Sequence, residues 1–344
     1  MKTYKFLFYI SQNYSFEILR PLQREIINAG HVVYWFAVGE TVDQKLFKES
    51  EQILETIEDA VALDADAVFV PGNKVPNFIP GLKIQIFHGL EWKKKGHFKI
   101  RGWFDLYCTH GSATTRVFKQ LAEKHRYFSV KETGWPKLDP LFTTEPLDYK
   151  NDSNKTKILF APTFSPSLTA AYELFSEIKM LSQSEEYEIL VKFHPKMAQD
   201  AIEKYLSLES NTLKVCQEEG VNELLQWADI MISDTSSIVG EFSLLNKPTI
   251  TLNNSQPGDY LIDIKDPNEL QPALKLALEP SDELRQSIAK YAKDLHPYSD
   301  GFSANRILNA TLELLKSDSK ITKKKPLNLL RSYKMRKLLG YWKF

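Results

Sequence analysis

Two short segments in the C-terminal half of the chain end in side chains that can hold a phosphate group. Residues 189–195 (Ile-Leu-Val-Lys-Phe-His-Pro) form an apolar run that stops at His194. Residues 229–237 contain a second apolar run, which stops in the cluster Ser-Asp-Thr-Ser-Ser. In an open α/β sheet, ligands bind beyond the carboxyl ends of the strands. A histidine and three adjacent hydroxyls at two such ends therefore suit a phosphorylated ligand.

The hydroxyl cluster, Thr235, Ser236 and Ser237, directly precedes a helix expected over residues 238–245. The first N–H groups and the positive end of a helix favour an anion. One hydroxyl would serve as the N-cap, but three in a row exceed what capping needs. Glu241, one turn into this helix, is expected either to bond a ribose or to lie on a solvated surface.

Two further residues in this half carry polar groups at strand ends. Thr163 follows a strand expected over residues 158–161, and its hydroxyl can face a ligand. Lys192 precedes His194 by two residues, so strand alternation puts both side chains on one face. Pro195 ends this strand and leaves the imidazole at its edge.

The N-terminal half contains a comparable strand end at His88, after a strand expected over residues 83–87. A histidine in this place either acts chemically or only bonds a neighbouring loop, and the local sequence leaves both open. The basic segment 91–97 is expected to be solvated or, beside a cleft, to attract an anionic acceptor. Thr114 and Thr115 are expected to cap the next helix.

The composition is that of a two-domain globular protein. With 344 residues, the chain exceeds the size at which one hydrophobic core usually suffices. Hydrophobic residues at 43% and charged residues at 26% are typical of soluble proteins. No apolar run approaches the ~18–20 residues of a membrane span, and no signal-peptide cleavage pattern is present. The two cysteines lie far apart in apolar contexts, which argues against a disulfide framework and favours the cytoplasm.

The net charge of zero conceals an asymmetry. Residues 317–344 contain nine lysines and arginines and one aspartate, a charge of +8, which leaves −8 on residues 1–316. This basic tail is expected to meet an anionic surface, or else to be disordered and solvated. If the tail is helical, four apolar residues share one face: Met335, Leu338, Leu339 and Trp342. Basic neighbours limit any insertion of that face to a shallow depth.

Strand-like runs alternate with helical periods, which is the pattern of βαβ units and a mostly parallel sheet. In the first half we expect strands at 5–10, 32–38, 67–71, 83–87 and 106–109, and helices at 16–29 and 52–62. In the second half we expect strands at 158–161, 187–193, 213–215, 230–233 and 249–252. The helices expected there are 168–181, 199–206, 221–227, 238–245, 282–295 and 304–315.

The sequence therefore predicts an α/β protein of two Rossmann-like domains that face each other across a cleft. Residues 146–157 are polar and aperiodic and are expected to act as a linker. The expected division is 1–150, then 151–316 with two closing helices, then the basic tail 317–344. No G-x-G-x-x-G, no G-x-x-x-x-G-K-[ST] and no metal-ligand spacing occurs, so no protein-bound metal is expected.

The ordered set of motifs resembles the CDP-glycerol glycerophosphotransferase family, which contains teichoic-acid primases and polymerases. The matching segments, in chain order, are 88–89, 105–111, 132–139, 158–163, 191–195, 228–237 and 300–306. The resemblance covers roughly residues 80–310, and residues 1–80 match only as a generic Rossmann half. Where family members usually carry Thr-Asp-Tyr-Ser-Ser, this chain has Ser-Asp-Thr-Ser-Ser at 233–237.

The resemblance implies a GT-B-like fold with an acceptor-side N-terminal domain and a C-terminal domain that holds most of the nucleotide donor. It implies that His88 and His194 are the two functionally important histidines, one from each domain. By the same resemblance, four residues would line the donor site: Ser236, Ser237, Asp300 and Gly301. The expected donor-binding set is completed by Thr163, Lys192, Thr235 and Glu241.

The implied enzyme moves glycerol phosphate from CDP-glycerol to a hydroxyl of a cell-surface glycan or lipid-linked precursor and releases CMP. Such a reaction belongs to teichoic-acid-like or capsule polymer synthesis. His88 would be the general base on the acceptor hydroxyl, and His194 would stabilise the departing CMP. No tightly bound cofactor is expected, although Mg²⁺ could accompany the substrate phosphates. The basic tail would dock the enzyme on the inner face of the cell membrane, and no nucleic-acid partner is expected.

Two other interpretations remain open. A GT-B glycosyltransferase that uses a nucleotide sugar, or a UDP-sugar epimerase, would keep the fold but needs polar groups for several ring hydroxyls. A non-catalytic scaffold of a capsule-assembly complex is the other. The sequence does not identify the acceptor, distinguish glycerol from ribitol, separate single addition from polymerisation, or set the oligomeric state.

Overall fold

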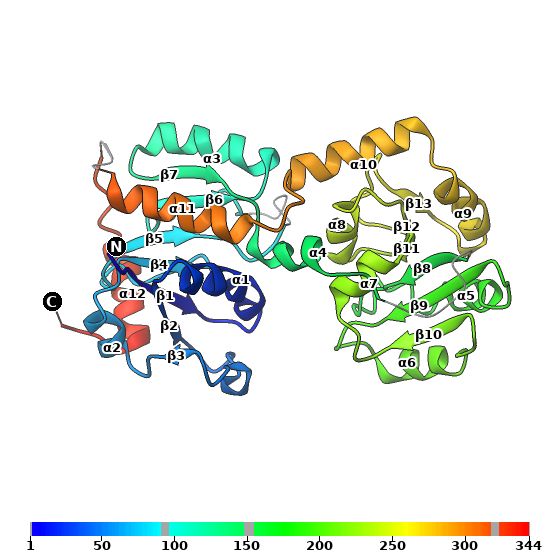
Figure 1. Cartoon of the computed structure of the whole chain (residues 1–344), viewed down its shortest axis with the longest axis horizontal. Coiled ribbons are helices and arrows are strands. Elements are labelled where there is room, and N and C mark those ends of the chain that lie inside the picture. Colours follow the sequence, from blue (N-terminus) through cyan, green and yellow to red (C-terminus); the bar gives the residue numbers. More distant parts are fainter. Residues whose placement is uncertain (1, 91–95, 148–154, 318–322, 344) are drawn as a thin grey trace. The chain divides into compact units, whose positions relative to one another are not determined.

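The computed structural model describes residues 2–90, 96–147, 155–317 and 323–343. The chain forms two compact units, which are Met1–Asp139 with Leu295–Phe344, and Pro140–Asp294. We call them the N-terminal unit and the C-terminal unit (Figure 1). Parts of three expected segments, the basic segment 91–97, the linker 146–157 and the tail 317–344, lie outside the described residues.

A parallel sheet of seven strands forms the centre of the N-terminal unit, in the order β3-β2-β1-β4-β5-β6-β7. Its strands are β1 Lys5–Ile10, β2 Val32–Ala37, β3 Gln52–Ile53, β4 Ala67–Val70, β5 Leu82–Gln85, β6 Leu106–Thr109 and β7 Ser129–Glu132. Its helices are α1 Ser15–Asn28, α2 Ile57–Ala62, α3 Ser112–His125, α11 Ser303–Lys316 and α12 Leu329–Leu339. The strand order reverses between β1 and β4, and ligand crevices form beyond the carboxyl ends of strands at such points.

The C-terminal unit is built on a parallel sheet of six strands, in the order β10-β9-β8-β11-β12-β13. Its strands are β8 Thr156–Phe160, β9 Tyr187–Lys192, β10 Leu213–Cys216, β11 Ile230–Ser233, β12 Thr249–Leu252 and β13 Ile262–Ile264. Its helices are α5 Phe175–Leu181, α6 Gln199–Leu206, α7 Val221–Trp227, α8 Ile238–Ser243, α9 Leu270–Leu278 and α10 Asp282–Leu295, while α4 Asp139–Thr143 begins at the boundary. Here the strand order reverses between β8 and β11.

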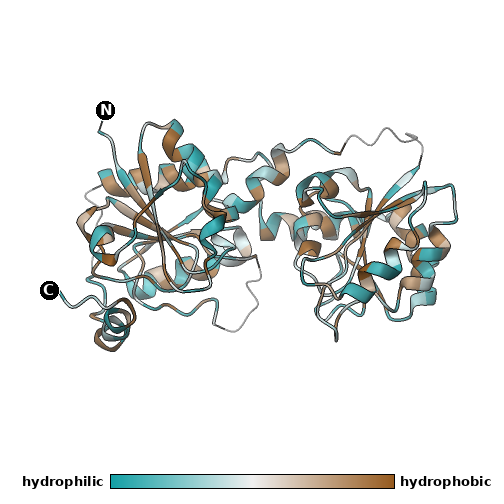
Figure 2. Ribbon diagram, turned by 90° about the horizontal axis from the view of Figure 1, so that it is seen from below, coloured by the Kyte–Doolittle hydropathy of each residue, from teal (hydrophilic) through white to brown (hydrophobic). Residues whose placement is uncertain are grey.

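The central strands of both sheets are mostly apolar and buried, because helices and loops cover both faces of a parallel sheet, whereas the edge strands β3 and β7 are exposed or half-buried. Strand β1 illustrates this point, since Phe6, Leu7 and Phe8 are all 0% exposed. The Phe8 ring packs edge-on against Trp35, with 4.9 Å between centroids. Figure 2 shows the same apolar character at the centre of each unit, where the strands are brown.

Most expected elements match the structure within one or two residues, and two of the expected helices differ in where they begin. The helix expected at 52–62 is wrong in its first part, because residues 52–53 form the edge strand β3. Helix α2 begins only after Thr56, whose side chain forms a reciprocal capping box with Asp59. The helix expected at 168–181 begins at Phe175. Strands β7 and β13 and helix α9 were not expected from the sequence, and both strands are short edge strands.

The two threonines that were expected to cap α3 lie inside its first turn instead. Gly111 occupies the N-cap position. The hydroxyls of Thr114 and Thr115 both donate to the Gly111 carbonyl, at 3.0 and 2.9 Å. They therefore extend the hydrogen bonding of the helix start without capping it.

The N-terminal unit extends beyond the expected boundaries, because the chain returns to it after the C-terminal unit. Helix α11 starts against Asp139, whose buried carboxylate accepts from the backbone N–H groups of Ser303 at 2.8 Å and Ala304 at 2.7 Å. The backbone N–H of Trp135 donates to His296 Nε2 at 2.9 Å. The closing helix expected in a 151–316 domain therefore belongs to the N-terminal unit (Figure 1, orange).

Part of the basic tail also packs on the N-terminal unit. Met335 and Tyr341 are buried there, and the Tyr341 ring stacks on Phe78 at 4.9 Å between centroids. The Lys325 ammonium lies 2.6 Å from the Asp105 carboxylate. Of the four apolar residues expected on one face, Met335 and Leu339 pack against the core of the unit, whereas Leu338 and Trp342 are exposed.

Candidate active site

The hydroxyl cluster of the C-terminal unit follows a buried acid, Asp234, that the sequence analysis did not single out. Asp234 is 0% exposed and lies directly after β11. Both of its carboxylate oxygens accept from the Thr163 N–H at 3.0 Å, and one also accepts from the Ala170 N–H at 2.9 Å. The Ser233 hydroxyl donates to the Ala161 carbonyl at 2.6 Å. These bonds tie loop 161–170, after β8, to the turn after β11.

A third loop joins at the same place. The Asn254 side-chain amide donates to the Asp234 carbonyl at 3.0 Å, and the Ser255 N–H donates to the Thr235 hydroxyl at 2.9 Å. The loops that follow β8, β11 and β12 are therefore bonded together at the carboxyl ends of their strands. The Thr235 oxygen accepts one of these bonds, so this hydroxyl supports the loop arrangement whether or not a ligand is present.

Ser236 and Ser237 present their side chains differently from Thr235. Ser236 is half-buried and Ser237 is exposed. Ser237 is the N-cap residue of α8, and the described structure gives its hydroxyl no capping bond. That hydroxyl is thus not committed to the helix start. The helix itself has only 6 residues, so its dipole supports an anion less than the sequence led us to expect.

Glu241 lies in α8 with 9% of its surface exposed. Its expected alternative, a solvated surface role, is therefore wrong. A bond from Glu241 to a ribose stays a prediction.

His194 follows β9 and is exposed. Its Nδ1 atom accepts from the Lys196 backbone N–H at 3.1 Å, so the neutral ring carries its proton on Nε2. The ring stacks on Phe164 with 4.3 Å between centroids. Partial burial, and secondly the charge of Lys196, hold the pKa of His194 below its ordinary value. The side chain is therefore a neutral N–H donor at its outer nitrogen.

Lys192, the expected basic partner of His194, is held elsewhere. Its ammonium donates to the carbonyls of Gln217 at 3.0 Å and Glu219 at 2.9 Å. Lys192 therefore fixes the turn after β10. A role in donor binding stays a prediction for this residue.

His88 follows β5 in the N-terminal unit and is also exposed. Its Nδ1 atom lies 3.3 Å from the Pro71 carbonyl oxygen, which can only accept, so Nδ1 carries the proton. The outer nitrogen, Nε2, then has a free lone pair. The ring stacks on Tyr14 at 5.5 Å between centroids. Phe87, directly before it, has a φ of 60°, which is unusual for a bulky residue and turns the chain after the strand.

The two histidines therefore have opposite tautomers. His88 exposes a lone pair, as a general base requires, and His194 exposes an N–H, as a phosphate ligand requires. The positions of His88 and His194 at strand ends were predictable from the sequence. The tautomers were not, because they depend on the Pro71 carbonyl and the Lys196 N–H.

Asp300 and Gly301 lie in the N-terminal unit, whereas the other predicted donor-site residues lie in the C-terminal unit. The Asp300 carboxylate pairs with the Arg306 guanidinium and accepts from the Phe302 N–H at 3.1 Å. Gly301 has a φ of 71°, so the turn before α11 uses the left-handed region that glycine tolerates. Their place in a donor site stays a prediction.

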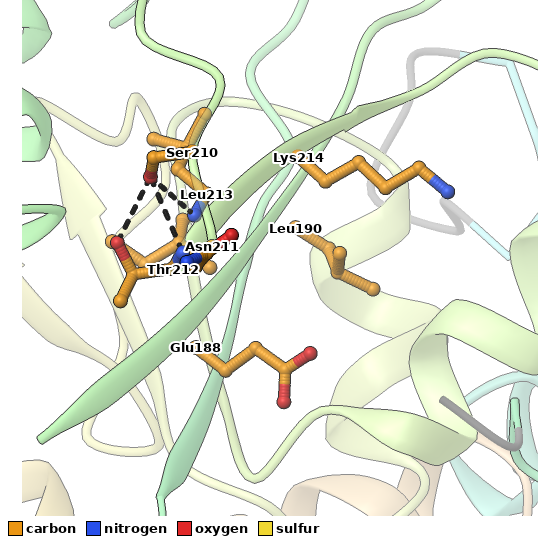
Figure 3. Close-up of a pocket in the computed structure, with 8 residues that line it drawn as sticks. Glu188, Leu190, Ser210, Asn211, Thr212, Leu213 and Lys214 are labelled. Carbon is orange, nitrogen blue, oxygen red and sulfur yellow. Dashed lines mark hydrogen bonds between the residues drawn. The ribbon is translucent and has the colours of Figure 1, made fainter. Parts of the chain in front are cut away.

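A pocket of about 260 Å³ lies away from all of these residues. Residues 188–190 and 210–214 line it, at the amino-terminal part of β9 and β10, whereas His194 follows the carboxyl end of β9. Figure 3 shows that the Ser210 hydroxyl is bonded to Thr212 and Leu213 at its rim. None of the predicted site residues contributes to this pocket.

The described residues contain neither a candidate metal site nor a helix that could cross a membrane. Within them, no group of three or more His, Cys, Asp or Glu side chains could hold a metal ion. No helix in the same part of the chain is both long and apolar enough to cross a membrane.

Solved structures with the same architecture define the fold class. The wall teichoic acid polymerase TagF, in a variant soaked with CDPG, is similar over 90% of this chain and 88% of that chain, with 16% identity and a TM-score of 0.61. A UDP-N-acetylglucosamine 2-epimerase is similar over 93% of this chain and 98% of that chain, with 15% identity and a TM-score of 0.62. The prediction of a GT-B-like α/β fold with two Rossmann-like units is confirmed.

Sequence comparisons identify the family. The profile of the CDP-glycerol:poly(glycerophosphate) glycerophosphotransferases matches residues 99–313, and this chain belongs to that family, as its motifs predict. A teichoic acid glycerol-phosphate primase of Bacillus subtilis (strain 168) is 30% identical over 234 residues, which are 61% of this chain and 58% of that protein. A teichoic acid poly(ribitol-phosphate) polymerase of Bacillus spizizenii is 33% identical over 141 residues, which are 36% of this chain and 22% of that protein. The chain thus spans little more than half the length of the first of these relatives.

Asp234 generates a prediction about stability and pH. Burial raises the pKa of Asp234 from 3.8 to about 6, although its bonds to Thr163 and Ala170 act in the opposite direction. The folded protein therefore binds this proton more tightly than the unfolded chain does. The resulting stability is fully present below about pH 4 and is lost as the pH rises through about 6, and two pKa units correspond to roughly 3 kcal/mol.

Asp234→Asn removes this titration. The unfolding free energy of the wild type minus that of the variant should fall by roughly 3 kcal/mol between pH 4 and pH 7. Urea denaturation at several pH values measures it. A difference that is the same at every pH would contradict the burial of an ionised Asp234.

Proposed function

We propose that this chain transfers glycerol phosphate from CDP-glycerol to a hydroxyl of a cell-surface glycan or lipid-linked precursor and releases CMP. The observation that carries the proposal is the family match over residues 99–313, a range that includes His194, Ser236 and Ser237. The tautomers of the two histidines support it independently, because the reaction needs one base and one donor to phosphate oxygen.

In the proposed reaction, His88 Nε2 removes the proton of the acceptor hydroxyl as its oxygen attacks the phosphorus that bears glycerol. An oxygen–phosphorus bond forms there. The bond from that phosphorus to the bridging oxygen of CMP breaks, and its electron pair leaves with CMP. The proton remains on His88. The Pro71 carbonyl supports this step because it holds the Nδ1 proton and so keeps the lone pair on the outer nitrogen.

The donor end of the reaction uses the C-terminal unit. His194 Nε2–H and the hydroxyls of Ser236 and Ser237 would bond the donor's phosphate oxygens, whose negative charge grows as CMP leaves. Thr163, Lys192, Thr235, Glu241, Asp300 and Gly301 complete the proposed donor set. Any Mg²⁺ in this reaction would travel with the substrate phosphates.

The first test is donor choice. Purified protein with a crude lipid extract should release CMP from CDP-glycerol or CDP-ribitol and no UDP from UDP-sugars. Nucleotide release is measured by chromatography with each donor separately. Release of UDP alone would replace the proposal with the glycosyltransferase or epimerase alternative, and no release or binding of any nucleotide would favour a scaffold.

The second test addresses His88. Loss of a positioned general base usually costs about 10²–10⁴-fold in turnover, so His88→Ala should lower kcat by that order with CDP-glycerol as donor. The donor KM should stay near the wild-type value, because the base acts on the acceptor. His125→Ala is the matched control, since His125 is a half-buried histidine at the end of α3 in the same unit. A wild-type kcat in His88→Ala would eliminate the proposed role.

We further propose that the protein works at the anionic inner face of the cell membrane, where a lipid-linked acceptor would lie. Besides the residues that pack on the N-terminal unit, the tail has a second surface, which is made of exposed side chains. It combines apolar side chains, Leu330 at 81% and Leu338 at 67% exposed, with the aromatic pair Tyr333 and Trp342 at 57% and 48%. The two aromatic rings contact each other at 5.6 Å. Aromatic and leucine side chains beside lysines are typical of an interfacial surface.

The described basic residues of the tail differ in what they bond and in how exposed they are. Lys325, Arg331 and Arg336 bond within the N-terminal unit and its tail. Lys334 and Lys337 are exposed on α12, beside Tyr333 and Leu338. Each lysine near an anionic surface contributes roughly 1 kcal/mol to binding. Lys334 and Lys337 therefore add attraction next to the exposed apolar and aromatic side chains, together with Lys323, Lys324 and Lys343, which are also exposed.

Vesicle binding tests this surface. Lys334→Glu with Lys337→Glu should abolish most sedimentation with vesicles rich in phosphatidylglycerol, because two attractive charges become repulsive. Deletion of the tail is a poor test, since it would remove buried Met335 and Tyr341. The control is Lys204→Glu with Lys290→Glu, two exposed lysines of the C-terminal unit, which makes the same change in net charge. Equal sedimentation of both variants would end the idea.

A further inference from the structure

The aromatic ring of Phe164 contacts two polar side chains of the loop that follows β9, His194 and Lys196. The His194 ring stacks on it with 4.3 Å between centroids and 30° between planes. The Lys196 ammonium lies 5.8 Å from the same ring centroid, within the range of a cation–π contact. Phe164 thus contacts a histidine and a lysine that come from a different loop.

The Phe164 ring is itself held by the end of β11. Phe164 follows Thr163, whose N–H is bonded to the buried Asp234 carboxylate at 3.0 Å. Ala170, six residues further, is bonded to the same carboxylate at 2.9 Å. Both ends of this short segment are therefore fixed. The ring has a defined place from which it can orient its two partners.

His194 and Lys196 are also fixed relative to each other. The Lys196 backbone N–H donates to His194 Nδ1 at 3.1 Å across the single residue Pro195. This bond directs His194 Nε2–H outward and places the lysine side chain next to the imidazole. Both side chains are exposed.

The ammonium of Lys196 differs from that of Lys192 in what it bonds. Lys192 donates to two carbonyls of the turn after β10. Among the described residues, Lys196 makes no ion pair, and the Phe164 ring is the contact of its ammonium. Lys196 is therefore a positive charge that a ligand can use.

We infer that Phe164 is a platform that positions His194 and Lys196 together as a two-donor site for the phosphates of a nucleoside diphosphate. His194 provides one directional N–H, and Lys196 provides the charge. Phe164 is a positioning residue, and Lys196 is a binding residue. The inference rests on the proposed function for the identity of the ligand as a CDP-polyol, but the anion site does not require a particular polyol.

The binding test compares Lys196→Gln with Lys204→Gln. Lys204 is a matched control, because it is an exposed lysine of the same unit whose ammonium lies 5.2 Å from the Tyr172 ring. Loss of a charge-assisted contact should raise the Kd of inorganic pyrophosphate and of CDP-glycerol by about tenfold in Lys196→Gln. Calorimetric titration measures both ligands. The Lys204→Gln variant should bind as the wild type does.

The positioning test compares Phe164→Leu, Phe164→Tyr and Phe175→Leu. The Kd of inorganic pyrophosphate should stay near the wild-type value in Phe164→Tyr and in Phe175→Leu and should rise in Phe164→Leu, while nitrogen-15 NMR should show the Nε2–H tautomer of His194 in all of them, because the Lys196 backbone N–H sets it. Phe175 is the control, since its half-buried ring contacts Tyr205. The double variant Phe164→Leu with Lys196→Gln should lose less affinity than the product of the two single losses, because Phe164 acts through the lysine.

The outcomes separate this inference from the proposed function. If CDP-glycerol is turned over and Lys196→Gln binds pyrophosphate as the wild type does, the two-donor site is overturned and the function stands. If pyrophosphate binding depends on Lys196 and Phe164 but no CDP-polyol is turned over, the site stands and the function falls. A wild-type pyrophosphate Kd in Phe164→Leu, or losses in the double variant that multiply, overturns the role of the platform.

Discussion

The buried carboxylate of Asp234 constrains the whole ligand end of the C-terminal unit. A carboxylate removed from water requires hydrogen bonds to offset the loss of hydration. Here the N–H groups of Thr163 and Ala170 supply them, so loop 161–170 must fold back over the end of β11. The position of Phe164 follows, and with it that of the His194 ring. The raised pKa of Asp234 indicates that burial outweighs these bonds, which is the reverse of a carboxylate held by cations.

The N-terminal unit positions its histidine by a different physical means. Phe87 has a φ of 60°, a conformation that costs of order 1 kcal/mol or more for a bulky residue. Its ring packs among aromatic side chains, with His97 stacked at 5.2 Å and Phe118 at 5.2 Å between centroids. This packing offsets the backbone strain. The chain turns at that point, so His88 leaves the sheet at the end of β5, with the Pro71 carbonyl in reach of Nδ1.

The sequence predicted those features of the structure that depend on residues close together in the chain. Apolar runs predicted β1, β9 and β11, and the polar residues that stop them predicted where His88, His194 and the hydroxyl cluster would lie. Asp234 was missed because an aspartate before a helix is usually a solvated cap, and its partner Thr163 is 71 residues away in the sequence. The tail packs against residues more than 200 positions earlier, as in the bond from Lys325 to the Trp103 carbonyl, which separates the two by 222 positions. The pattern of apolar residues within 317–344 could not predict such a contact, because it depends on residues far away in the sequence.

The return of residues 295–343 to the N-terminal unit has a consequence for how the chain acquires its structure. The C-terminal unit is one continuous stretch, Pro140–Asp294, whereas the N-terminal unit is made of two stretches separated by that whole unit. During synthesis, domains generally fold as the ribosome releases them. The seven-stranded sheet is therefore released before α11 and the tail that cover it, while the C-terminal unit has all its residues as soon as Asp294 emerges. The N-terminal unit thus begins before the C-terminal unit and is completed after it, and its apolar surface around Phe78 must wait for Met335 and Tyr341.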